Sequence, residues 1–441
     1  FNLSMSINKK IYDIIGIGIG PFNLGLAAML ENLPQLSSIF FDQSPGFNWH
    51  PGMLLPNARL QVPFYADLTT IVDPCSKFTF LNYLKQKQRL FRFAIHENNF
   101  ITRREYNDYC KWAAEQLDNL RFQHTVVDVH YDCKDDIYTV MVHNLVSDSL
   151  LFYHAKHLVI GIGTQPNLPK SVQGINHPCI FHSSEYLFHK NDVLGKAKIA
   201  IIGSGQSAAE IFFDLLSYSD QFYDLSWFTR SSRFYPMEYS KLSLEMTSVD
   251  YIDHFYGLSS HKKKEVNRSQ VQLYKGINFS LINEIYDTLY LKALYDNTSS
   301  VHLCTNTDLK SVTILNDEVT AQFYHREIEK EFTHTTEALI LATGYQFCLP
   351  SFLDAIKDSL QFSDDGLYEV NRNYSIDAAG KRVFVQNAEL HTHGFNAPDL
   401  GMGPYRNAVI LNAILGYEHF LLEKKIAFQT FGLTDVKELN S

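Results

Sequence analysis

The stretch DIIGIGIGPFNLGLAAML, residues 13–30, places Gly16, Gly18 and Gly20 between an apolar run and a helix-like segment that begins at Pro21. Glycines at this spacing after a buried strand let the backbone N–H groups at a helix start meet a pyrophosphate. Asp42 lies 22 residues after Gly20, at the end of the next predicted strand, where its carboxylate can accept hydrogen bonds from ribose hydroxyls. Together these features favour a dinucleotide site over a purely structural glycine turn.

A second loop of the same kind follows in IIGSGQSAAEIFFDLL, residues 201–216, which contains Gly203, Gly205, Gln206 and Ser207 and has an alanine in place of the third glycine. The strand predicted after it ends near Arg230 and Arg233 rather than at an acid. An arginine there suits the extra 2′-phosphate of NADPH, although a surface arginine would look the same. The second nucleotide is therefore predicted to be NADPH. The first is then predicted to be FAD, because NADPH can reduce a flavin by hydride transfer.

Composition narrows the class of protein. The net charge of −10 disfavours nucleic acid as a partner, and no apolar run reaches the ~18 residues needed to span a membrane. The six cysteines form no CxxC pair, which fits a reducing cytoplasm and gives no metal site. A disulfide reductase would need a close cysteine pair beside the flavin, but Cys110 and Cys133 are 23 residues apart. The reduced flavin is left to reduce a small acceptor or to activate oxygen.

Strand-then-helix units alternate through most of the 441 residues, which predicts an α/β fold with parallel sheets and more than one domain. We expect two Rossmann-like dinucleotide-binding domains and a small helical substrate-binding region. The expected FAD domain comprises residues 1–190 and 348–441, and the NADPH domain residues 191–235 and 298–347. The polar and aromatic helices of residues 236–297 form the helical insert.

Seven segments carry a resemblance to a known family: GIGIGPFNLGLA, FNWHPGMLLPNARLQVPF, DPCSKFTFLNYL, RREYNDYCKWAAEQL, GSGQSAAE, INFSLINEIY and EALILATGYQFCLP. In order and spacing they resemble the flavin-dependent N-hydroxylating monooxygenases of siderophore biosynthesis, which include the lysine and ornithine N-hydroxylases. The resemblance covers residues 11–420. The last segment is similar to the family's D-x3-L-ATGY-x4-P pattern, with Glu337 in place of the aspartate.

This resemblance implies a reaction and a set of site residues. NADPH reduces FAD, O2 adds at the flavin C4a carbon, and a neutral primary amine attacks the resulting hydroperoxide in a site that excludes water. By motif, Trp49, His50 and Gln61 are similar to flavin-contacting residues, Ser207 and Arg230 to NADPH-binding ones, and Asn278 to an asparagine that touches substrate and NADP+. Thr343, Gly344 and Tyr345 belong to the ATGY pattern. Taken alone, Trp49 and His50 would be packing residues and Asn278 a helix N-cap. The family also implies a homo-oligomer, usually a tetramer.

Two departures from the family concern the substrate. Where the amino-acid hydroxylases have a lysine that holds the substrate carboxylate, this chain has Ala66, and where they have a serine near the α-group it has Gly401. A buried carboxylate without a cation is unfavourable by several kcal/mol, so we expect a decarboxylated amine such as putrescine, cadaverine or histamine. Asp399 and Asp67 are candidates for holding a second ammonium group, although either could equally be a turn or helix-cap aspartate.

Other functions stay open on the sequence alone. The chain could hydroxylate L-ornithine or L-lysine, or be a broader flavin monooxygenase that acts on sulfur, another nitrogen or a ketone. From a different class, it could bind FAD and NADPH as a sensor without turnover.

Overall fold

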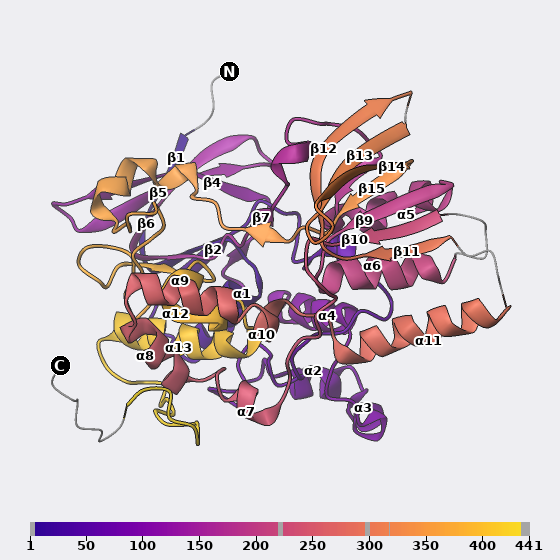
Figure 1. Cartoon of the computed structure of the whole chain (residues 1–441). Coiled ribbons are helices and arrows are strands. Elements are labelled where there is room, and N and C mark those ends of the chain that lie inside the picture. The colour runs from indigo at the N-terminus through magenta and orange to yellow at the C-terminus, as the bar shows by residue number, and fades with distance from the viewer. Residues whose placement is uncertain (1–4, 219–223, 296–299, 317, 434–441) are drawn as a thin grey trace, which may run out of the picture.

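The first half of the molecule is built on a mixed sheet around the opening glycine loop. A computed structural model describes residues 5–218, 224–295, 300–316 and 318–433 (Figure 1). The strands run in the order β3-β2-β1-β6-β5-β4, with β17 also paired to β6. Their bounds are β1 Met5–Ile17, β2 Ser38–Phe41, β3 Leu120–Arg121, β4 His124–Asp132, β5 Ile137–Asn144, β6 Ser149–Ile160 and β17 Val383–Val385. Helices α1 (Pro21–Leu30) and α13 (Gly403–Leu415) pack against each other, so both ends of the chain contribute to this half.

The second half repeats the central arrangement with a smaller, parallel sheet in the order β11-β10-β9-β15-β8. Its strands are β8 Ile180–His182, β9 Lys198–Ile202, β10 Asp224–Phe228, β11 Val301–Cys304 and β15 Ala338–Leu341. Helices α5 (Tyr186–Leu194) and α6 (Gln206–Leu216) belong to this half. An antiparallel meander, β12 Thr307–Leu315, β13 Glu318–His325 and β14 Lys330–Thr336, packs on one face of the sheet, where Phe323 stacks on Phe228 (Figure 1). Two Rossmann-like units in an α/β chain are thus confirmed.

The two glycine loops have the same local geometry. Gly18 has a φ of +87°, and a Cβ built there would lie 2.4 Å from the carbonyl oxygen of Gly161 at the end of β6. Gly203 has a φ of +154°, and a Cβ there would lie 2.2 Å from the carbonyl oxygen of Ala342 at the end of β15. Each loop therefore needs glycine for two reasons, the positive φ and the close approach of a neighbouring backbone.

A buried amide network holds the first loop against the C-terminal part of the chain. Asn23 Nδ2 donates to the Gly18 carbonyl oxygen at 2.8 Å, and Asn23 Oδ1 accepts from Gln386 Nε2 at 2.8 Å. Gln386 also donates to Asn407 Oδ1 at 2.8 Å, and Asn407 Nδ2 donates to the Phe22 carbonyl oxygen at 3.0 Å. These three amides are almost fully buried, so losing one partner would leave a polar group unsatisfied in the core.

The expected domain limits need one correction. Residues up to 190 were assigned to the FAD domain, but β8 pairs with β15 and is therefore part of the second sheet. The reason is that Phe181 and its neighbours are buried against the core of the second half, which a three-residue strand could not signal in the sequence. The chain returns to the first half through a two-stranded link, β7 (Gln165–Pro166) paired with β16 (Tyr345–Gln346).

The helical segment of residues 236–297 divides between two neighbours. Helices α8 (Val249–Gly257) and α9 (Ser260–Ser269) pack on α12 (Leu390–His393), whereas α11 (Phe279–Tyr295) packs on α6. Of the two short helices in the segment, α7 (Lys241–Leu244) precedes α8 and α10 (Gln272–Lys275) lies between α9 and α11. The entry and exit of the segment pair with each other, because Ile277 N–H donates to the Tyr235 carbonyl and Met237 N–H donates to the Ile277 carbonyl.

A buried ion pair ties α13 to the loop after β17. The Arg406 guanidinium contacts the Glu389 carboxylate, also donates to the Ala397 carbonyl oxygen at 3.0 Å, and lies 4.3 Å from the centre of the Phe22 ring. Both charged side chains are at most 2% exposed. Burial raises the pKa of Glu389, and the Arg406 charge opposes that shift.

Replacing Arg406 with methionine should lower the free energy of unfolding by about 3–5 kcal/mol, because Glu389 would lose its charged partner in the core. Urea unfolding followed by circular dichroism measures this. The matched control is Arg326→Met, which breaks the half-exposed Arg326–Asp308 pair and should change stability by about 1 kcal/mol or less. Equal effects of the two variants would contradict this reading of the buried pair.

Candidate functional site

The first loop places the predicted flavin-binding residues at the start of α1. Gly20 is the N-cap residue, Pro21 is the first helical residue, and a Cβ at Gly20 would meet no atom within 4 Å, which leaves space in front of the helix. Asp42 lies beside the loop, where its Oδ2 accepts the Ile19 N–H at 2.7 Å. Gly16 differs from the others, because it lies within β1 and leaves room for the Phe40 ring.

The second loop likewise leaves open space in front of the N-terminus of its helix. Gly205 is the N-cap of α6, and Ser207 lies half-buried in its first turn. A Cβ at Gly205 would approach only the Lys275 carbonyl oxygen, at 3.6 Å. Arg230 is exposed just beyond β10, and its charge lowers the pKa of Lys275, after the larger effect of burial. Two neighbouring cations beside a helix N-terminus suit a phosphate group.

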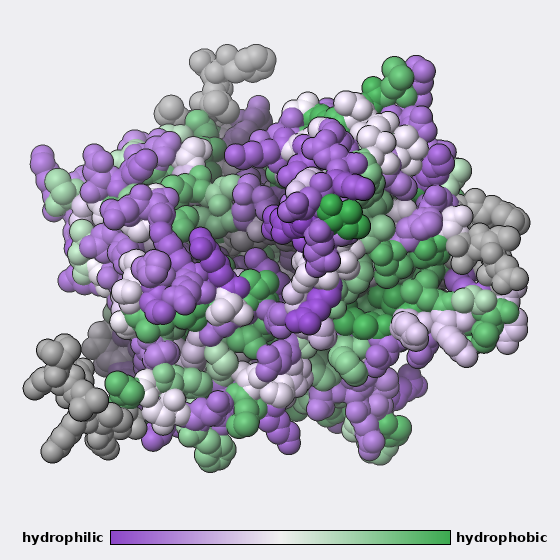
Figure 2. All heavy atoms as spheres, viewed as in Figure 1, coloured by the Kyte–Doolittle hydropathy of each residue, from purple (hydrophilic) through white to green (hydrophobic). Residues whose placement is uncertain are grey.

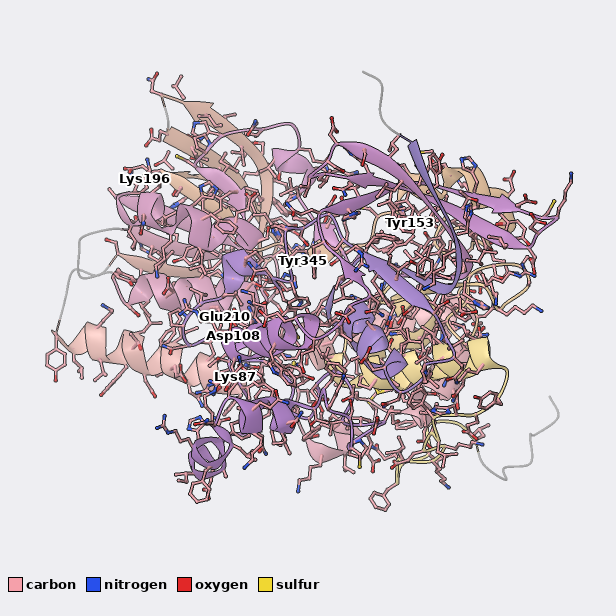
Figure 3. The ribbon with its side chains drawn as sticks, turned by 180° about the vertical axis from the view of Figure 1, so that it is seen from behind. Lys87, Asp108, Tyr153, Lys196, Glu210 and Tyr345 are labelled. Atoms are coloured by element: carbon pink, nitrogen blue, oxygen red, sulfur yellow. The ribbon has the colours of Figure 1, made fainter. Side chains whose placement is uncertain are left out.

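Aromatic side chains meet where the two halves join. Trp49 packs edge-on against His50 and Tyr106, and its backbone N–H donates to Asn107 Oδ1 at 2.7 Å. The His50 and Tyr345 rings are 5.5 Å apart. Tyr345 lies in the link between the sheets, near the centre of Figure 3.

His50 has a neutral ring at ordinary pH. Its side chain is accessible to solvent, yet it lies deep enough among protein atoms for desolvation, helped by the Arg103 charge, to lower its pKa to about 4. Its φ of +48° is unusual for a residue other than glycine.

The link formed by β7 and β16, beside His50, is held by two further contacts. Thr343 Oγ1 donates to the Asn167 carbonyl oxygen at 2.6 Å, and His182 Nε2 lies 3.0 Å from the Gly344 carbonyl oxygen.

The two residues predicted to act at the reaction centre contact each other. Gln61 Nε2 donates to Asn278 Oδ1 at 3.1 Å and to the Gly276 carbonyl oxygen at 3.0 Å, although Gln61 and Asn278 are 217 residues apart. Asn278 N–H in turn donates to Gln206 Oε1 at 2.8 Å. These three amides line a cavity of about 920 Å³ that also contacts Met237 and Tyr239. The face in Figure 2 is hollowed near its centre, between the two halves of Figure 1.

The predicted substrate residues Ala66, Asp399 and Gly401 also come together. A Cβ at Gly401 would lie 3.5 Å from the Ala66 Cβ and 3.0 Å from Asp399 Oδ1. Asp399 accepts the Gly401 N–H at 2.7 Å, and burial raises the pKa of its carboxyl group. Asp399 also lies close enough to Tyr239 to contribute to the raised pKa of that hydroxyl, together with burial and Tyr65. A carboxyl group therefore neighbours the position where a lysine is missing.

Asp67 does not join this group. Its Oδ1 accepts the Thr69 and Thr70 N–H groups, and its Oδ2 accepts the Thr70 hydroxyl and the Phe80 N–H, all between 2.6 and 3.0 Å. A carboxylate has about four lone-pair positions, so these donors fill it. Asp67 is a buried turn residue, and the prediction that it could hold a substrate ammonium was wrong.

Sequence reasoning missed the polar groups behind the site. Glu210 Oε2 accepts from Arg103 Nη1 at 2.8 Å, and its Oε1 accepts from Gln206 Nε2 at 2.8 Å. The only available signal was position, since Glu210 follows Gln206 by one helical turn and Arg103 begins the RREYNDYCKWAAEQL segment. Among the residues described here, no three His, Cys, Asp or Glu side chains gather as a metal site would require. In the same residues, each helix is too short or too polar to cross a bilayer.

Gly18→Ala should abolish FAD retention and lower stability, because alanine is strained at a φ of +87° and its Cβ would collide with the Gly161 carbonyl. The flavin absorbance per polypeptide after purification measures the loss. Gly46→Ala is the control, since a Cβ there meets no atom within 4 Å and the backbone needs no positive φ. A Gly18→Ala protein that is purified with a full complement of flavin would contradict the loop assignment.

Comparisons with known proteins agree with this geometry. The family described as L-lysine 6-monooxygenase/L-ornithine 5-monooxygenase matches residues 10–347. A putrescine N-hydroxylase from Shewanella oneidensis is 48% identical over 433 residues, which cover 98% of this chain and 86% of that protein. The FAD-bound crystal structure of a cadaverine monooxygenase of the desferrioxamine biosynthetic pathway, from Erwinia amylovora, has a TM-score of 0.95 and 48% identity, covering 97% of this chain and 100% of that one. An ornithine N-hydroxylase from Kutzneria sp. 744, solved with reduced FAD, NADP+ and L-ornithine, has a TM-score of 0.86 and 26% identity over 92% of this chain and 99% of that one.

Proposed function

We propose that this chain, which belongs to the L-lysine 6-monooxygenase/L-ornithine 5-monooxygenase family, N-hydroxylates one primary amine of a diamine and so supplies a hydroxylamine for siderophore biosynthesis. It is a flavin-dependent monooxygenase that uses FAD and NADPH. The observation that carries the substrate proposal is the carboxyl group of Asp399 beside Ala66 and Gly401. The printed substrates of the Shewanella and Erwinia relatives, putrescine and cadaverine, support it.

The two open helix starts fit the two cofactors. Gly18, Gly20 and Asp42 would hold the pyrophosphate and ribose of FAD, while Gly205, Ser207 and Arg230 would hold NADPH. When both are bound, NADPH would reduce FAD, and the reduced flavin would activate O2 for the oxidation of the amine. The aromatic group between the two loops would pack against the flavin ring and exclude water from it; its members are Trp49, His50 and Tyr345.

The site chooses between substrates by charge. An amino acid brings a carboxylate, which finds alanine in place of a lysine at Ala66 and an acid at Asp399. The nearby cation, Arg406, is already paired with Glu389. A diamine brings a second ammonium, which Asp399 can accept as a charge-assisted hydrogen bond. The Tyr239 hydroxyl, which lies close enough to Asp399 to feel its charge, adds an oxygen that can accept from an ammonium. We therefore expect the distal ammonium to lie near Asp399 and the reacting amine near Asn278.

The reacting amine has to be neutral, although a free alkyl amine has a pKa near ~10.4. Gln61 and Asn278 are uncharged amides that contact each other, and desolvation against them disfavours an ammonium. Carboxylates also line the same cavity, and one of them, Glu210, is paired with Arg103. Burial at this position favours the neutral amine, while Asp399 keeps the far ammonium charged. The two ends of one diamine are thereby given different protonation states.

Putrescine or cadaverine should support coupled turnover, with one hydroxylamine formed for each NADPH oxidised, and L-ornithine and L-lysine should not. NADPH oxidation with hydroxylamine detection over putrescine, cadaverine, histamine, ornithine and lysine measures this. Histamine carries an imidazole instead of a second ammonium and tests how far Asp399 requires a full charge. Strong coupled turnover of ornithine or lysine, without activity on the amines, would sink the proposal. A sulfoxide or ester as product would favour a broader flavin monooxygenase.

Asp399→Asn should raise KM for the diamine about tenfold or more with a smaller change in kcat, because a hydrogen bond to a charged group contributes about 1.5–3 kcal/mol. Steady-state kinetics with putrescine or cadaverine measure the split. Asp364→Asn removes the same charge from an exposed position and should leave both constants unchanged. An unchanged KM in Asp399→Asn would place the distal ammonium elsewhere.

The homo-oligomer, tetrameric by resemblance, stays a prediction. Exposed apolar side chains on α11, among them Tyr286, Tyr290 and Leu294, support it, since a monomer would leave them in water. Figure 2 shows hydrophobic residues exposed on the right, near where Figure 1 draws α11. The cytoplasmic location also stays a prediction.

A further inference from the structure

A continuous chain of polar contacts crosses between the two halves behind the reaction centre. Arg103, the first residue of α4 (Arg103–Ala114), pairs with Glu210 on α6, and their side chains are only 14% and 4% exposed. Glu210 accepts from Gln206, Gln206 accepts from Asn278, and Asn278 accepts from Gln61. Figure 3 labels Glu210 near the middle of the molecule, where α6 and α4 approach each other.

The donors and acceptors in this chain determine how each amide is turned. A carboxylate only accepts, so Gln206 must direct its NH2 group to Glu210 and its oxygen to the Asn278 backbone N–H. The Gly276 carbonyl also only accepts, so Gln61 must direct its NH2 group inward, and the Asn278 atom that faces it must be oxygen. Asn278 is then left with its NH2 group, and Gln61 with its oxygen, for other partners.

We propose that Glu210, held by Arg103, is a positioning residue for the N-hydroxylation: through Gln206, which accepts the Asn278 backbone N–H, it sets the place of Asn278 at the reaction centre. This inference rests on the proposed function for its kinetic consequence. The Gln61 oxygen can accept an N–H of the neutral amine, which leaves the single lone pair of that nitrogen free for attack, and the Asn278 NH2 group is available to another acceptor. Glu210 thus helps to orient the amine although it does not touch it.

A simpler role for the pair would be to brace the two halves. The two roles differ in what they affect, because a brace contributes stability alone, whereas a positioning residue also controls Asn278. The same helix provides a matched comparison. Asp214, one turn after Glu210, pairs with Lys190 at 2.7 Å and accepts from the Tyr186 hydroxyl at 2.6 Å. In the part of the chain that the structure describes, neither of these bonds leads on to Asn278.

The test compares Glu210→Gln, Gln206→Met and Asp214→Asn in the holoenzyme by two measurements. Glutamine at 210 has one oxygen for two donors, so it can satisfy Gln206 or Arg103 but not both. Hydrogen–deuterium exchange is read on the peptide that contains Asn278. The hydroxylamine formed per NADPH oxidised, and KM for the diamine, are measured on the same preparations.

Gln206→Met and Glu210→Gln should speed exchange at the Asn278 amide about tenfold. A tenfold change corresponds to the loss of one hydrogen bond whose contribution is near the upper end of the usual range. They should also reduce the hydroxylamine yield per NADPH about tenfold, because a displaced polar group misorients the amine. Asp214→Asn should leave the exchange at Asn278 and the yield unchanged while lowering the melting temperature.

Two results would overturn the inference: unchanged exchange at Asn278 in both variants, or a Glu210→Gln protein that behaves in every measurement like Asp214→Asn. If the wild-type enzyme forms no hydroxylamine from any amine, the proposed function fails. The exchange comparison still decides whether Glu210 positions Asn278.

Discussion

Each of the two Rossmann-like sheets depends on a close contact between a loop glycine and a carbonyl oxygen at the end of the neighbouring strand. Gly18 fits against Gly161 and Gly203 against Ala342, and neither position has room for a side chain. The contact turns the chain sharply at the strand end, so that the following helix begins with free N–H groups and open space in front of them. Because both sheets contain this arrangement, one chain can hold the reductant and the flavin in separate but comparable sites.

The junction between the halves is polar where the reaction centre lies. Apolar packing would hold the halves together without specifying the rotation of any amide, whereas a buried carboxylate accepts from particular donors at particular distances. The Arg103–Glu210 pair adds little stability by this argument, since desolvation offsets most of the attraction between buried charges. The pair instead fixes relative position, because it connects α4 of one half, through Gln206, to Asn278 just before α11.

Much of this could be predicted from the sequence, because glycine spacing and apolar runs are local signals. Local signals could not distinguish Asp67 from Asp399: both follow a turn-forming pattern, and only the donors around Asp67, contributed as far away as Phe80, show that it is already satisfied. The Asn23–Gln386 contact joins residues 363 apart, and the Arg103–Glu210 contact joins residues 107 apart. Such pairings depend on how the elements pack, which no short stretch of sequence encodes. The strand at residues 180–182 was assigned to the wrong half for the same reason.

The paired ends of the helical segment have a consequence for how this enzyme could diversify. Tyr235 and Met237 at its entry bond to Ile277 at its exit, so the chain leaves and returns at one point, directly before Asn278. Helices α7 to α10 therefore form a loop whose two ends meet, with α8 and α9 packed on α12. Where that packing is kept, we expect that these helices can be lengthened, shortened or exchanged between relatives without moving Asn278, the amide proposed to face the substrate. A lineage could in this way acquire a new amine specificity by trading one module, while the oxidising machinery is inherited intact.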